Sequence, residues 1–143
     1  MGKVRKSIEV EAPVERVFQL WSDFENFPGF MENVQAVERT GDRTTRWKVE
    51  APLGRFVEWE AETTALDRNR RIAWRATGDV GNSGEVRFQP RGAGRTLVEV
   101  DMEYHAPAGP LGELAARVFD NPAKDVEEDL ARFKDLAEGR EVV

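Results

Sequence analysis

Tyrosine, histidine and cysteine side chains are scarce in this sequence. It contains one tyrosine, Tyr104, one histidine, His105, and no cysteine, so a Ser–His pair, a cysteine nucleophile or a His- and Cys-rich metal site is hard to assemble. Tyr104 falls on the apolar face of a predicted strand; its hydroxyl could donate a hydrogen bond to a ligand carbonyl, although a structural role is favoured. His105 has the opposite parity and is expected at the surface. We predict no catalytic residue, no metal and no cofactor.

Acidic side chains recur at alternate positions in two segments, Glu58 to Glu62 and Glu99 to Glu103. Strand parity places them opposite the apolar residues, where a hydrated carboxylate keeps its ordinary pKa. They indicate solubility and not acid–base catalysis. Thr45, Thr63 and Thr96 share the apolar parity and could orient a ligand, but threonine is also simply a good strand former.

Composition and charge limit the class of protein. A chain of 143 residues, 40% apolar and 34% charged, fits one folded domain spanning residues 1–143. The net charge of −6 argues against a nucleic-acid partner. No apolar run reaches the roughly 20 residues that a transmembrane helix needs, so we expect a soluble cytoplasmic protein. Arginine greatly outnumbers lysine, which fits a GC-rich genome or a thermophilic source, and we lean toward the thermophile.

The elements that must position these side chains begin with a strand over residues 3–11, where mostly apolar and polar residues alternate. Pro13 suits the first turn of a short helix that carries Val17 and Trp21. A second short helix bears Phe24 and ends at Pro28-Gly29. From residue 34 to 105 the period becomes two, with turn residues between the segments, which predicts six antiparallel strands.

The period returns to that of a helix after residue 110. One apolar stripe is predicted, with the acidic and basic residues on the remaining surface; its members are Leu111, Leu114, Ala115, Val118, Phe119, Val126, Leu130 and Phe133. Pro122 should kink this long helix near Phe119 or divide it, with Asp120 or Asn121 as a new cap. The element order predicts an α+β fold in which a curved, seven-stranded antiparallel sheet is closed by the last helix.

The segment DFENFPGFM, residues 23–31, followed by Val34 and Val37, resembles the signature segment of the START-like, birch-pollen-allergen-like superfamily. More narrowly, it is similar to that of the bacterial polyketide cyclase/dehydrase group. Further pieces match in the same order between residue 7 and about residue 136: IEVEAP at 8–13, PLG at 52–54, IAW at 72–74 and NSGEVRF at 82–88. Each piece is common by itself, and their order carries the resemblance.

The resemblance implies the helix-grip fold, in which the sheet wraps around the C-terminal helix and leaves a deep pocket for a hydrophobic small molecule. The residues then expected to contact the ligand are Phe24, Phe27, Phe30, Met31, Trp47, Val49, Val57, Trp59, Trp74, Phe88, Met102, Tyr104, Leu114, Val118, Phe119 and Pro122. Phe24, Phe27, Phe30 and Met31 would lie near the mouth of the pocket. For any one of these phenylalanines, ordinary core packing is favoured over ligand contact.

Three functions remain open at this point. We favour a monomeric or homodimeric binder of a hydrophobic ligand, because the inward face is aromatic and has no convergent titratable groups. The resemblance also allows a polyketide cyclase, aromatase or dehydratase. A third possibility is a protein-interaction module that docks through apolar residues between Phe27 and Met31.

Overall fold

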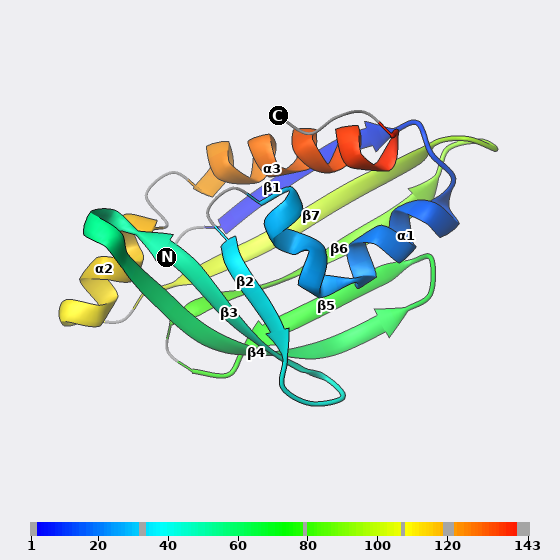
Figure 1. The fold of residues 1–143 in the computed structure, drawn as a ribbon. Helices are drawn as coiled ribbons and strands as arrows, with labels where there is room; N and C mark the ends of the chain where they lie inside the picture. The colour runs from blue at the N-terminus through cyan, green and yellow to red at the C-terminus, as the bar shows by residue number, and fades with distance from the viewer. Residues whose placement is uncertain (1–2, 32–33, 79, 107, 119–121, 140–143) are drawn as a thin grey trace.

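Strands and helices follow one another in the predicted order in a computed structural model that describes residues 3–31, 34–78, 80–106, 108–118 and 122–139. The strands are β1 (Lys3–Val10), β2 (Val34–Arg39), β3 (Thr44–Ala51), β4 (Arg55–Asp67), β5 (Arg71–Ala76), β6 (Gly81–Pro90) and β7 (Thr96–His105). The helices are α1 (Val14–Ser22), the 3-10 helices η1 (Phe24–Gly29) and η2 (Pro52–Gly54), α2 (Pro110–Val118) and α3 (Pro122–Ala137). The predicted α+β architecture is confirmed (Figure 1).

The seven strands form one antiparallel sheet in the order β1-β7-β6-β5-β4-β3-β2. Each strand from β2 to β6 pairs with the next one along the chain, so short hairpins set their register, while β1 pairs with β7. Opposite residues of such a pair project to the same face of the sheet. Trp47 of β3 therefore stands directly beside Trp59 of β4, as the alternation predicts.

Two proline residues mark the starts of helices. Pro13 has extended backbone angles and immediately precedes α1, whose Val17 and Trp21 are buried. Pro122 is the first residue of α3, where its missing N–H removes no intrahelical hydrogen bond. The C-terminal region is thus divided into two helices, the second of the two outcomes that the sequence allows.

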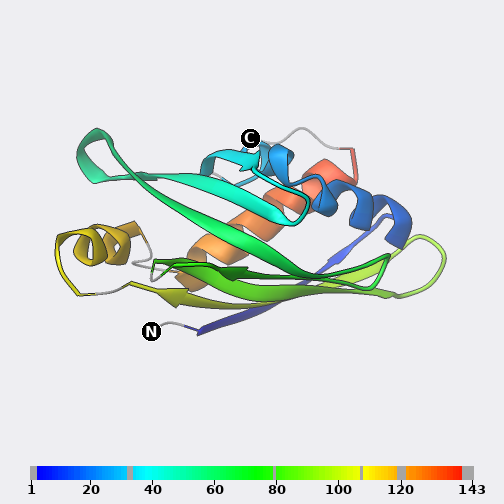
Figure 2. The ribbon, with the colours of Figure 1, turned by 90° about the horizontal axis from the view of Figure 1, so that it is seen from below.

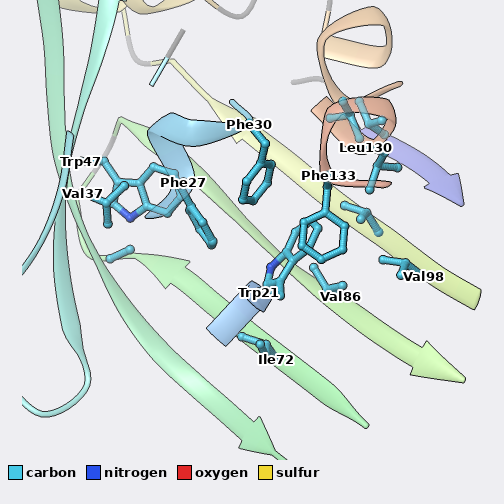
Figure 3. Packing of buried hydrophobic residues seen from close by; sticks show 14 of the residues in the cluster. Trp21, Phe27, Phe30, Val37, Trp47, Ile72, Val86, Val98, Leu130 and Phe133 are labelled. Atoms are coloured by element: carbon cyan, nitrogen blue, oxygen red, sulfur yellow. The ribbon is translucent and has the colours of Figure 1, made fainter. Parts of the chain in front are cut away.

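Helix α3 closes the concave side of the curved sheet, whereas α2 lies apart, beside the tip of the β3–β4 hairpin (Figure 2). The buried side of α3 consists of Val126, Leu130, Phe133 and Ala137. The ring of Phe133 lies 4.7 Å from that of Trp21 and 5.1 Å from that of Phe30, measured between centroids. Figure 3 shows these rings turned toward one another over the inner face of the sheet. No helix in the described part of the chain is long and apolar enough to cross a membrane.

Candidate functional site

A pocket of about 100 Å³ lies between the inner face of the sheet and the first half of α3. Its wall includes predicted contact residues from η1, from the segment after η1 and from four strands: Phe24, Phe27, Met31, Trp47, Val49, Trp59, Trp74, Met102 and Tyr104. Strand parity brings the side chains of the four strands to one face, and the curvature of the sheet brings them together.

Other predicted contact residues are buried in the core and do not line the pocket. The ring of Phe30 packs on Phe133, and the ring of Phe88 lies edge-on to Phe18 with the centroids 5.5 Å apart. Val57 is fully buried.

The α2 region contributes no described side chain to the pocket. Leu114 is half-buried and packs against the core, outside the pocket wall. Phe119 and the side chains of Val118 and Pro122 lie outside the described residues, so their predicted contacts stay predictions.

All four tryptophans of the chain and its one tyrosine line this pocket. The indoles of Trp47 and Trp59 are stacked, with centroids 6.1 Å apart and planes 8° from parallel. The Nε1 of Trp47 donates a hydrogen bond to Thr45 Oγ1 at 3.0 Å, and that of Trp74 donates to Asn82 Oδ1 at 2.7 Å. Because these two indole N–H groups are satisfied within the protein, the rings offer a ligand chiefly their apolar faces.

The threonines with inward parity have different surroundings. Thr45 and Thr63 line the pocket. Thr96 instead donates its hydroxyl hydrogen to the carbonyl oxygen of Ala12 at 2.9 Å, which holds β7 to the segment between β1 and α1. His105 is half-buried and does not line the pocket.

Two carboxylates that the sequence pattern misses, Asp125 and Asp129 of α3, also line the pocket. The expectation that the acidic residues of the last helix avoid the inner face is wrong for this pair. They lie four residues apart, each directly before a buried residue, Val126 or Leu130. That spacing on one helix face is the signal that could have identified them.

The polar side chains of the pocket influence one another. Burial raises the pKa of Tyr104 well above its ordinary value, and the negative charges of Asp129 and then Asp125 raise this pKa further. The phenol therefore stays protonated at neutral pH, so it can serve as a hydrogen-bond donor and not as a general base.

Asp129 is also part of the contact between α3 and the segment after η1. The Nη2 atom of Arg132 donates to Asp129 Oδ1 at 2.6 Å, and the Nε atom of the same guanidinium donates to the backbone oxygen of Phe30 at 2.8 Å. Arg132 thereby fixes the Asp129 carboxylate at the pocket wall.

Comparisons with known proteins found relatives of this chain. The profile of a family described as "Polyketide cyclase / dehydrase and lipid transport" matches residues 1–138. An uncharacterized 17.2 kDa protein of Streptomyces lincolnensis is 33% identical over 141 residues, which cover 98% of this chain and 92% of that protein.

Solved structures have the same fold. A Deinococcus radiodurans protein of 36% identity superposes with a TM-score of 0.77, covering 96% of this chain and 98% of its own. The Zhui aromatase/cyclase from a Streptomyces species superposes with a TM-score of 0.76 at 22% identity, covering 96% of this chain and 93% of its own. At that identity the second likeness concerns the fold alone.

Proposed function

Because the chain belongs to the polyketide cyclase/dehydrase and lipid transport family, we propose that it binds a hydrophobic small molecule in the pocket between the sheet and α3. One observation carries the proposal: every tryptophan and the single tyrosine of the chain gather on the wall of this pocket. Clefts that bind small molecules are typically aromatic and apolar with a few polar groups.

The volume of the pocket bounds the size of the ligand. About 100 Å³ is less than the roughly 300 to 1,000 Å³ of sites that enclose drug-sized molecules, and closer to a cavity of about 150 Å³ that admits benzene. A ligand with one aromatic ring or a short alkyl chain matches this space. Phe24 and Met31 are only half-buried, so a longer ligand would displace these two side chains first.

The proposal is tested by titrating the protein with a panel of alkylbenzenes, quinones, short lipids and polyketide fragments. The four indole N–H signals in NMR spectra, together with tryptophan fluorescence, report directly on the pocket. Val34→Phe adds a ring at a half-buried position of the pocket wall, and Gln35→Phe adds the same ring at the exposed neighbouring position as a control.

We expect ligands to shift the indole signals of the wild type and the Gln35→Phe control, and to bind the Val34→Phe variant much more weakly. Absence of binding across the panel, or equal binding by both variants, would contradict the proposal.

A second function, cyclisation or dehydration of a bound polyketide, is favoured by the convergence of Tyr104, Asp125 and Asp129 on the pocket. A neutral phenol can donate a hydrogen bond to a carbonyl, and a carboxylate can accept a proton. Incubation with a polyketide thioester tests this function. Loss of turnover in Tyr104→Phe and Asp129→Asn with retained binding would support it. Absence of turnover by the wild type would exclude it, and undiminished turnover in both variants would exclude a role for these two side chains.

A further inference from the structure

The pocket has an unusual combination of walls for a hydrophobic site: aromatic rings on the sheet side and two carboxylates on the helix side. None of the described residues that line it is basic. Asp125 and Asp129 form hydrogen-bond acceptors when ionised and have no proton to donate. The wall that a ligand meets is therefore negatively charged.

The guanidinium of Arg132 lies behind this wall. Arg132 is not a lining residue, and it forms an ion pair with Asp129 over 2.6 Å. This ion pair weakens the negative potential that Asp129 contributes to the pocket, yet the charges of both Asp129 and Asp125 still raise the pKa of Tyr104.

The field of the two carboxylates reaches the opposite wall. Burial is the main reason that the pKa of Tyr104 is raised, but Asp129 and Asp125 both add to it by charge repulsion with the phenolate. Tyr104 belongs to β7 and the two acids belong to α3, so their interaction acts across the pocket. A second anion placed between them would be repelled in the same way, and a cation would be attracted.

The aromatic wall favours the same sign of charge. The faces of indole rings carry a negative quadrupole and attract ammonium groups, and the attraction grows where water is excluded. Trp47 and Trp59 are less than a tenth exposed, at 8% and 6%, and both border the pocket. Rings and carboxylates that surround one small space together suit an organic cation.

From this arrangement we infer that the ligand is an amine: a protonated nitrogen near Asp125 and Asp129, with an apolar ring or chain against the tryptophans. This inference rests on the proposed binding function and names the class of molecule that the pocket selects. A carboxylate or fatty-acid ligand is disfavoured, since its head would be buried beside two like charges.

Three probes with the same apolar body separate the classes: phenethylamine, 2-phenylethanol and phenylacetate. Dissociation constants are measured at pH 7 and low salt from the indole N–H shifts of the full chain. We expect phenethylamine to bind about tenfold more tightly than 2-phenylethanol, and phenylacetate to bind most weakly.

Asp125→Asn isolates the contribution of the charge. We expect the ratio of its affinity for phenethylamine to its affinity for 2-phenylethanol to fall about tenfold in this variant. Glu128→Gln removes the same charge from an exposed position of the same helix, and should change neither affinity by more than about twofold. Asp129 is left intact in this experiment because its ion pair with Arg132 holds the helix in place.

The outcomes distinguish this inference from the binding function itself. Suppose that 2-phenylethanol binds and that phenylacetate binds at least as tightly as phenethylamine. This result would overturn the amine inference and still support the hydrophobic pocket. Equal loss of phenethylamine binding in Glu128→Gln and Asp125→Asn would also overturn it. Failure of all three probes to bind would count against the binding function and the inference together. The wild-type comparison decides the matter even if Asp125→Asn does not fold.

Discussion

Truncation of Phe133 is expected to release α3 from the sheet and thereby destroy the pocket. The side chain has no exposed surface, and its ring lies 4.7 Å from Trp21 and 5.1 Å from Phe30. Replacement of a buried phenylalanine by alanine costs about 3 to 5 kcal/mol, including the cavity left behind. Loss of two aromatic contacts, each worth about 0.5 to 1.5 kcal/mol, places Phe133→Ala near the upper end, at about 4 to 5 kcal/mol.

Equilibrium denaturation in urea, followed by far-ultraviolet circular dichroism, measures this loss. Circular dichroism is preferred because the fluorescence of Trp21 would respond to the missing ring directly. Phe56→Ala is the matched control: Phe56 is 39% exposed and contacts Lys48, whose Nζ lies 4.3 Å from the ring centroid. We expect the control to lose at most about 1 kcal/mol.

A domain of this size has a total stability of about 5 to 15 kcal/mol, so Phe133→Ala should be detectably unfolded at modest urea concentrations. A loss for Phe133→Ala no greater than that for Phe56→Ala would refute the reasoning. Such a result would mean that the rings of Trp21 and Phe30 do not depend on α3 for their packing, and that α3 does not close the sheet.

Three further substitutions test other features. Leu53 is 88% exposed and has a left-handed backbone (φ 63°, ψ 36°), so Leu53→Gly should raise the stability by about 1 kcal/mol, seen as a higher melting temperature; an unchanged or lower value would contradict this strain. Gly84→Ala should cost more than about 2 kcal/mol and weaken the β6–β7 pairing, because the added Cβ would lie 2.1 Å from the backbone oxygen of Asp101; normal stability in urea denaturation would show that the strands can separate at no cost. In the folded protein the pKa of Asp101 is lowered, mainly by the hydrogen bond from Arg5. Burial raises this pKa, and the hydrogen bond from Arg87 lowers it further. Its carboxylate therefore stabilises the protein fully above the unfolded pKa of about 3.9 and loses this effect as the pH falls through the lower folded pKa. Asp101→Asn should thus cost up to about 1 kcal/mol at pH 7 and little at strongly acidic pH, and a cost independent of pH would disprove the assignment.

The sequence by itself determined the order of the elements and the faces of the strands. Side chains of a strand alternate between two faces whatever the strand packs on, so the inward parity of Trp47, Trp59 and Tyr104 is a local property of the chain. The helix boundaries at Pro13 and Pro122 are also local, because the ring of proline restricts its own backbone and that of the preceding residue.

Only the tertiary structure decided which inward residues form the pocket wall and which fill the core. Phe30 and Phe27 are three residues apart in the same segment, yet Phe30 packs under Phe133 and Phe27 borders the pocket. Which of the two rings lines the pocket depends on where α3 crosses the sheet, and that position follows from contacts between residues about 100 positions apart in the sequence. A sequence pattern within ten or twenty residues does not contain these long-range contacts.

The two pocket carboxylates of α3 are a second example of a feature that the sequence determines in part and the tertiary structure completes. A hydrophobic stripe determines which side of α3 faces the sheet. The edges of the buried surface of α3, however, depend on the rotation of the helix about its axis when Val126, Leu130 and Phe133 are packed in the core. That rotation brings Asp125 and Asp129 to the pocket wall. The chemistry that the pocket selects is therefore set by the packing of the assembled fold, because the charge of a side chain is local but the surface that it faces is not.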